Sequence, residues 1–185
     1  MIEQSGKLKL IPIGSIDNGN PDETIPLKGI NAYTVLADGK LKKERVKALF
    51  KRKSPKKLME IKSELGCEVI ATYDHEILVF DGKKIVRKKA AKVKAGDRIL
   101  ILNKMREKSL KSIIMDYKKA FGNKSSIFEK VERNLRIKRK NLEKIGSFVL
   151  DKIKSMEEIV SHEEYVYDLI VEGNKTFIAG FGNLG

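Results

Sequence analysis

The stretch Ala71-Thr72-Tyr73-Asp74-His75-Glu76-Ile77-Leu78-Val79 places a hydroxyl and an imidazole three residues apart, directly between two apolar runs. The two runs, residues 67–72 and 76–80, have the length and the residue types of short strands. A hairpin-turn signal, Phe80-Asp81-Gly82-Lys83, comes next, and the strand-like segment 93–101 follows it. We therefore expect Thr72 and His75 at the junction of two strands in a β-rich protein.

Short strand-like segments at close spacing fill the rest of residues 1–103. One of them, Tyr33–Leu36, is followed by Asp38-Gly39, which predicts a hairpin with a type I′ turn. Period-2 alternation returns from Glu163 and continues through residues 165–172 and 176–180. This series of short strands predicts a mostly β fold built from antiparallel strands.

Between Met105 and Met156 the apolar residues change from period 2 to helical spacing. The pattern predicts three short helices, the second capped by Ser126 and the third by Asn141. The apolar faces carry Leu110, Ile113, Ile114 and Tyr117, then Phe128, Val131 and Leu135, then Leu142, Ile145, Val149 and Ile153. The predicted division of the chain is residues 1–103, a helical insertion over residues 104–161, and residues 162–185.

The net charge of +14 is concentrated in the predicted insertion. From Lys104 to Lys154 there are 16 Lys and Arg against 6 Asp and Glu, a surplus of 10 positive charges. A basic turn joins two of the predicted helices, and its cationic residues are Arg136, Lys138, Arg139 and Lys140. Two interpretations stay open: a small DNA-binding module of the helix-turn-helix type, in which these residues contact phosphates, and a solvated helical spacer without a ligand.

Composition limits the remaining function classes. The chain of 185 residues is 41% hydrophobic and 35% charged, which suits one globular core. Its single cysteine, Cys67, excludes a disulfide framework and a four-thiolate zinc site, and we expect neither a metal nor a cofactor. No apolar run approaches roughly 18 residues and no signal peptide is recognisable, so we expect a cytoplasmic monomer without membrane contact. Frequent Lys, Glu and Ile with no Trp is compatible with a thermophile.

Together, the Thr-x-x-His stretch, the segment 93–101 and the segment 165–180 resemble, in this order, the self-splicing inteins and the wider hedgehog/intein (Hint) family. The resemblance covers Lys7 to Gly182 and is strong around residues 69–101 and 165–182. It implies a flattened horseshoe or disk of antiparallel strands, whose two β portions reassemble around an insertion that is often a homing endonuclease or its remnant. The insertion here is short and lacks the two acidic dodecapeptide motifs, so nuclease activity is not expected.

The resemblance also implies a function, autocatalytic protein splicing in a single turnover without a cofactor. The partners would be the flanking host-protein segments, the exteins, in cis. His75 would donate the proton to the departing amide nitrogen, and Thr72 would hydrogen-bond the scissile peptide or the developing oxyanion. Asp168 matches the family aspartate that couples the first acyl shift to transfer of the N-terminal flank, a role that depends on a raised pKa.

The chain departs from the family pattern at both ends. An intein starts with Cys or Ser, whereas Met1 falls inside the region that should follow this nucleophile, and the family closes with His-Asn. Asn183 is the candidate terminal asparagine, but Leu184 after it offers no nucleophile, and Lys175 replaces a histidine common in the penultimate strand. We therefore expect the chain as written not to splice, or the true end to lie beyond Gly185.

For most of these residues, a purely structural role without catalysis is an alternative interpretation. His75 would then be a partly exposed polar residue at a strand end, and Asp168 a turn cap. We expect Asp74 and His162 at the surface, and Cys67 as a small buried hydrophobe. The competing function is a nucleic-acid-binding module in which the β portion is only a scaffold for the basic segment.

Overall fold

The computed structural model describes residues 2–9, 13–17, 19–20, 22–103, 142–173, 176–179 and 183–184. Within these ranges the regular structure is antiparallel β-strand, apart from two short 3-10 helices, η1 (Ile13–Ile16) and η2 (Ala90–Lys92). No helix in the described ranges has the length and apolar character needed to cross a bilayer. The predicted mostly β fold of antiparallel strands is confirmed.

The first sheet joins strands from both ends of the chain. Its longest strand, β5 (Leu41–Lys53), pairs with β4 (Ile30–Val35) through its first residues and with β13 (Tyr165–Val171) through the rest. Buried and exposed side chains alternate along much of β5, as expected for a strand with one face on a core. The short strands are β1 (Ile2–Gln4), β2 (Lys7–Lys9) and β3 (Thr24–Pro26).

The second sheet is organised around β12 (Phe148–Val160), which pairs with β10 (Arg98–Leu102) and then with β6 (Lys57–Ser63). On its other edge, β10 pairs with β8 (Glu76–Phe80). The remaining strands of this sheet are β7 (Glu68–Ala71), β9 (Ile85–Lys89), β11 (Lys144–Ile145), β14 (Ile178–Ala179) and β15 (Asn183–Leu184).

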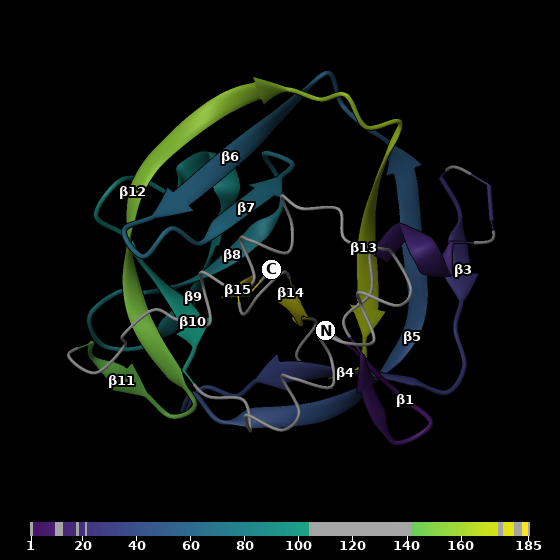
Figure 1. The fold of residues 1–185 in the computed structure, drawn as a ribbon, viewed down its shortest axis with the longest axis horizontal. Coiled ribbons are helices and arrows are strands. Elements are labelled where there is room, and N and C mark those ends of the chain that lie inside the picture. The colour runs from purple at the N-terminus through teal and green to yellow at the C-terminus, as the bar shows by residue number, and fades with distance from the viewer. Residues whose placement is uncertain are drawn as a thin grey trace.

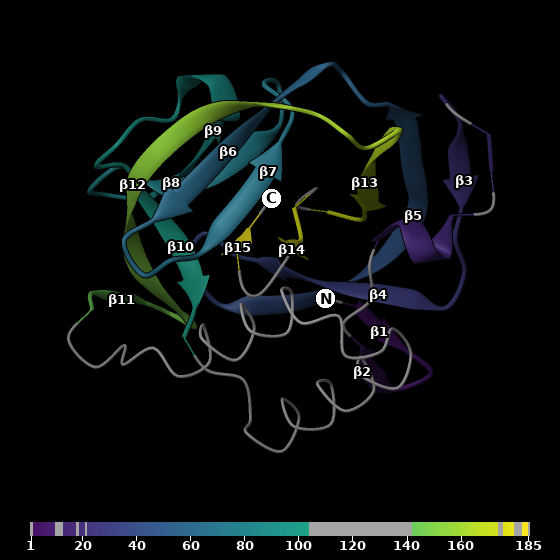
Figure 2. The ribbon, with the colours of Figure 1, turned by 45° about the horizontal axis from the view of Figure 1, so that its top comes forward.

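The two sheets close into a flattened ring, with β12 and β6 curving along one side and β5 and β13 along the other (Figure 1). Both views place β14 and β15 inside this ring (Figures 1 and 2). One buried cluster joins Val35 of β4 to Leu78, Leu100 and Phe148 of the second sheet. The sheets therefore share a core, and the strands form one joined disk.

Two glycine turns meet where the β4–β5 hairpin contacts the β11–β12 hairpin. The Ser147 amide donates to the Gly39 carbonyl at 2.9 Å. A Cβ on Gly39 would lie 2.5 Å from the Ile145 carbonyl oxygen, and one on Gly146 would lie 2.4 Å from the backbone of Gly39. The two backbones can approach this closely because the contacting residues, Gly39 and Gly146, have no Cβ.

The predicted type I′ turn at Asp38-Gly39 is wrong in its type, although the hairpin itself is confirmed. Gly39 has a φ of +79°, but Asp38 is not among the described residues with a positive φ, and a type I′ turn needs two. The Gly39 amide donates to the Leu36 carbonyl at 2.9 Å. This geometry fits a type I turn followed by one left-handed residue, a common longer hairpin loop.

The third predicted helix is also wrong, because its residues form β11 and β12. Leu142, Ile145, Val149 and Ile153 fit helical spacing, but Phe148 to Asp151 are four consecutive buried residues, which is the pattern of a strand covered on both faces. Pairing with β10 and β6 satisfies the backbone of this segment. The first two predicted helices lie outside the described residues.

Replacing Gly39 with alanine should lower the free energy of unfolding by about 2–4 kcal/mol, which combines left-handed strain with overpacking. Gly66 is the matched control, because its φ of +80° is nearly identical and a Cβ there would meet nothing within 4 Å. Gly66→Ala should therefore cost only the strain, about 1–2 kcal/mol. Urea unfolding of both variants measures the difference, and equal losses would show that the contact between the two hairpins is unimportant.

Candidate functional site

Thr72 and His75 lie in the loop that joins β7 to β8, at the predicted strand junction. The His75 amide donates to the Thr72 carbonyl at 3.1 Å, which closes a tight turn. The N-terminal end of η2 holds the same loop, since the Ala90 amide donates to the His75 carbonyl at 2.8 Å and the Ala91 amide to the Tyr73 carbonyl at 3.0 Å. These bonds use main-chain atoms alone, so the loop conformation does not depend on the His75 imidazole.

Asp168 lies in β13, opposite Phe50 of β5, and one of its carboxylate oxygens accepts the Leu169 amide at 2.8 Å. Burial raises the pKa of Asp168 above its ordinary value, and the charges of His75 and Arg52 oppose this rise. His75 and Asp168, 93 positions apart in the sequence, are thus close enough to interact electrostatically. A carboxyl group with a raised pKa keeps its proton to higher pH and can donate it.

Arg52 of β5 connects the Thr-x-x-His loop to the first sheet. Its Nη2 donates to the Thr72 hydroxyl at 3.1 Å and to an Asp74 carboxylate oxygen at 3.0 Å. Hydrogen bonds from the Thr72 hydroxyl and from Arg52 lower the pKa of Asp74 to about 2. No sequence signal marks Arg52 as a site residue, because it stands in a lysine-rich strand and has no spacing relationship to the loop that it contacts.

The Thr72 hydroxyl is held between an acceptor and a donor. An ionised carboxylate only accepts hydrogen bonds, so the bond between Thr72 and Asp74 uses the single hydroxyl proton of Thr72. Arg52 occupies one of the two lone pairs of the same oxygen. In this arrangement the remaining capacity of Thr72 is one lone pair, which suits a peptide N–H better than an oxyanion.

Asn183 lies in β15, where it pairs with Ile101 of β10 and Ala179 of β14. Because β10 also pairs with β8, the strand that follows His75, β15 and the Thr-x-x-His loop belong to the same sheet. β14 and β15 lie inside the ring formed by the outer strands (Figure 2). The fold thus brings the segment after Asp168 back into the sheet that carries His75.

The sequence pattern of the intein splicing domain family matches residues 22–184, most of the chain. The chain belongs to the intein splicing domain family. A crystal structure of the transcription factor IIB Mvu mini-intein has a TM-score of 0.69 at 18% identity, with 99% of this chain and 93% of that one covered. The crystal structure of an intein from a hyperthermophile has a TM-score of 0.70 at 17% identity, covering 99% and 92%. At these identities the likeness shows the fold alone.

Two curated relatives match this intein domain over shorter segments. The DNA polymerase II large subunit of Thermococcus kodakarensis is 37% identical over 73 residues, which cover 39% of this chain. A DNA polymerase of Thermococcus litoralis is 54% identical over 39 residues, which cover 21% of it. The matched segments span only 4% and 2% of the length of these polymerases. The similarity is therefore to small parts of much longer proteins.

The other site predictions divide into those that fall on described residues and those that do not. Asp74 and His162 are exposed and Cys67 is buried, as predicted. The four candidate DNA-binding residues, Arg136, Lys138, Arg139 and Lys140, lie outside the described residues, as does Lys175. Among the described residues no group of His, Cys, Asp and Glu is arranged to hold a metal ion.

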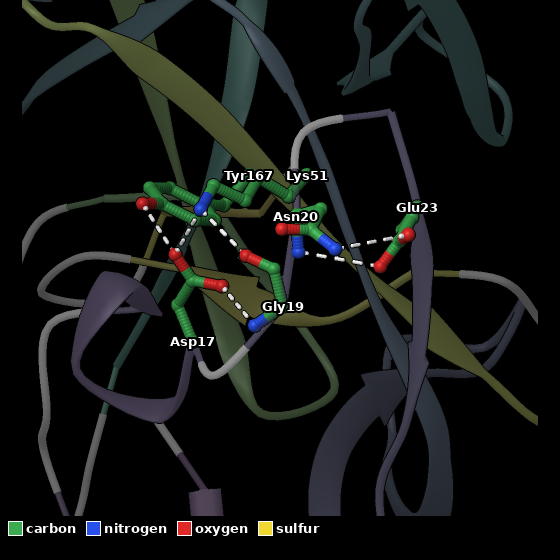
Figure 3. A network of polar contacts seen from close by, with 6 residues as sticks. All are labelled: Asp17, Gly19, Asn20, Glu23, Lys51 and Tyr167. Carbon is green, nitrogen blue, oxygen red and sulfur yellow. Dashed lines mark hydrogen bonds and ion pairs between the residues drawn. The ribbon is translucent and has the colours of Figure 1, made fainter.

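A polar network links Lys51 of β5 and Tyr167 of β13 through Asp17, which is half-buried (Figure 3). The Lys51 Nζ lies 2.7 Å from an Asp17 carboxylate oxygen, which also accepts the Tyr167 hydroxyl at 3.1 Å. Lys51 further donates to the Gly19 carbonyl at 2.9 Å, and its hydrogen bond is the main cause that lowers the pKa of Asp17. Tyr167 and Lys51 face each other in the β13–β5 register, one step from Asp168. This network holds the strand that carries Asp168 in place.

Proposed function

We propose that this intein domain performs autocatalytic protein splicing in a precursor that supplies a first nucleophile and a nucleophile after Asn183, with His75, Thr72, Asp168 and Asn183 as its working residues. The observation that carries the proposal is the match of residues 22–184 to the intein splicing domain family. The geometry supports it, because Arg52, which lies on the strand paired with the one that carries Asp168, contacts Thr72 in the Thr-x-x-His loop. His75 and Asp168 are 93 positions apart in the sequence, and Asp168 is half-buried in β13.

In the first step, the nucleophile that begins an intein attacks the preceding carbonyl carbon, and the peptide C–N bond breaks as the (thio)ester forms. His75 supplies the proton that the departing amide nitrogen needs. Thr72 accepts a hydrogen bond from the scissile peptide N–H through its remaining lone pair, which holds the peptide against the loop.

In the later steps, Asp168 links the first acyl shift to transfer of the N-terminal flank, because a protonated carboxyl group beside the site donates a proton to a leaving group. Asn183 releases the C-terminal flank when its side-chain amide nitrogen attacks its own carbonyl carbon and the following peptide bond breaks. The partners are host-protein segments on both sides of the domain, and the polymerase relatives, in which the matched segments are a small fraction of the length, support such an embedded position.

We further propose that the insertion interrupts the β domain after β10. Within the predicted insertion over residues 104–161, Lys144–Ile145 and Phe148–Val160 form β11 and β12 of the second sheet, so the insertion would end before β11. The described residues that follow return to the second sheet.

A precursor tests the splicing function. Before the chain it carries a folded reporter domain, then a cysteine with the short segment that follows it in the family. At the other end Gly182 is replaced by histidine and Leu184 by cysteine, so that Asn183 is followed by a nucleophile, and a second reporter comes after Gly185. A ligated product of the two reporters on a denaturing gel, with the excised domain beside it, is expected. A precursor that folds yet stays intact, with or without added thiol, would refute the proposal.

DNA binding by the insertion is a second candidate, favoured by the surplus of 10 positive charges between Lys104 and Lys154. Affinity for labelled duplex DNA should fall steeply as the salt concentration rises. Replacing Arg136, Lys138, Arg139 and Lys140 with glutamine should reduce the slope of log affinity against log salt by about 3 to 4. If the unchanged protein does not bind at low salt, the insertion is a spacer.

A further inference from the structure

The Arg52 guanidinium lies between three groups of the candidate site. It contacts Thr72 and Asp74 directly, at 3.1 Å and 3.0 Å. Its charge also acts on Asp168 in β13. Arg52 belongs to the first sheet, whereas Thr72 and Asp74 lie in a loop of the second, so the same side chain spans the seam where the two sheets meet.

The strand register explains why Arg52 reaches Asp168 as well as the loop. Arg52 is the cross-strand partner of Val166, and Phe50 is the partner of Asp168. Side chains of directly opposed residues in an antiparallel pair share a face, and residues two apart along a strand share it too. Arg52 and Asp168 therefore project from the same face of the β5–β13 pair, toward the loop that carries His75.

The hydrogen bonds that Thr72 makes with Arg52 and Asp74 determine how its hydroxyl can bind a substrate peptide. Without Arg52, the hydroxyl could turn its proton away from Asp74 and present either a donor or an acceptor to a bound peptide. With Arg52 on one lone pair and Asp74 on the proton, one orientation is fixed. A hydroxyl that is already oriented favours the reaction, because it loses little rotational entropy when the scissile peptide binds.

We propose that Arg52 is a positioning residue of the splicing site, which orients the Thr72 hydroxyl and supplies a fixed positive charge beside Asp168. This role of Arg52 rests on the proposed splicing function. The contacts of Arg52 with Thr72 and Asp74 do not depend on that function. The competing explanation is an ordinary surface ion pair between Arg52 and Asp74, which are 37% and 63% exposed and would contribute little on their own.

The first test uses the chain as it stands and is independent of splicing. NMR titration of the aspartate carboxyl carbons and of the Thr72 side chain is compared in the wild type, Arg52→Met and Arg45→Met. Arg45 lies on the same strand and is exposed, which makes it the matched control. Arg52 and His75 are the charged groups that oppose the raised pKa of Asp168, so Arg52→Met should raise this pKa further. Arg52→Met should also allow the Thr72 side chain to adopt other rotamers. Arg45→Met should change neither the Asp168 pKa nor the Thr72 rotamer.

The second test measures N-terminal cleavage in the precursor. Arg52→Met should slow cleavage by about 10- to 100-fold, the scale of a misplaced positioning group, and should shift the pH profile upward with the Asp168 pKa. Arg52→Lys keeps the charge but lacks the planar fork, so it should restore the pH profile more fully than the rate. Arg45→Met should cleave like the wild type.

The outcomes separate this inference from the splicing proposal. If Arg52→Met leaves both the Asp168 pKa and the Thr72 rotamer unchanged, or if its precursor cleaves at the wild-type rate, Arg52 is a surface residue and the inference is wrong. If the unchanged precursor never cleaves, the splicing proposal fails, and the NMR comparison still decides whether Arg52 orients Thr72.

Discussion

Replacing His75 with alanine in the precursor should reduce the rate of N-terminal cleavage by about 10²- to 10⁴-fold, the usual contribution of a general acid or base. Without the imidazole, the departing amide nitrogen must take its proton from water. Added thiol, which cleaves any (thio)ester that forms, should not restore the N-terminal product, because the first acyl shift itself is blocked. Time courses on denaturing gels provide the rate.

The fold should survive this substitution. The hydrogen bonds that shape the loop use the amide and carbonyl of residue 75, and alanine keeps both. His162 is the matched control, because it is the other histidine of the chain and is exposed. His162→Ala should splice normally. Wild-type cleavage by His75→Ala, with an unchanged urea midpoint, would show that this histidine is only a polar residue at a strand end.

Replacing Asp168 with asparagine should reduce the ligated product by about 100-fold or more while leaving the first acyl shift intact. The N-terminal reporter should therefore still be released when thiol is added, in contrast to the His75 variant. Asparagine has nearly the same shape but cannot give up a proton near neutral pH. The ratio of thiol-released to ligated reporter measures the step at which the reaction stops.

The same substitution should change stability in the opposite direction from activity. Burial raises the pKa of Asp168 above its ordinary value of 3.8, so the folded state holds the proton more tightly than the unfolded state. The stability from this group is fully present below the ordinary pKa and is lost as the pH rises through the folded-state pKa. At neutral pH, a neutral asparagine at this position should therefore raise the melting temperature.

Asp151 provides the matched control for Asp168. It is a buried carboxyl group, 2% exposed, and burial raises its pKa as it raises that of the half-buried Asp168. It lies in β12 opposite Ile99, and its carboxylate accepts the Leu65 amide at 3.3 Å. Asp151→Asn should leave splicing unchanged. An equal loss of ligation in both variants would mean that Asp168 acts through the fold and not through its proton.

Local sequence was enough to predict the strands and the loop that carries the candidate site. Asp81-Gly82 produced the expected turn, in which the Asp81 carboxylate accepts the Lys83 and Lys84 amides at 2.9 Å. Apolar runs on both sides of Thr72 and His75 became β7 and β8. These features depend on residues within a few positions of one another, which is the range that turn chemistry and alternation cover.

The predictions failed where distant partners decide the structure. The apolar spacing of Leu142 to Ile153 is compatible with a helix, and only the edges of β10 and β6 make this segment a strand. The type I′ turn at Asp38-Gly39, by contrast, failed for a local reason, because the loop is longer than two residues, with the Gly39 amide bonded to the Leu36 carbonyl. Arg52 was missed because one more cation in a lysine-rich strand carries no signal of what it contacts.

The sequence by itself determined that this chain forms β-hairpins, that a hydroxyl and an imidazole share one loop, and that an aspartate lies in a late strand. Only the tertiary structure decided that His75, Arg52 and Asp168 interact and that the pKa of Asp168 is raised. The physical reason is that hydrogen bonding and alternation act between neighbours along the chain, whereas desolvation and charge interactions depend on distance in space.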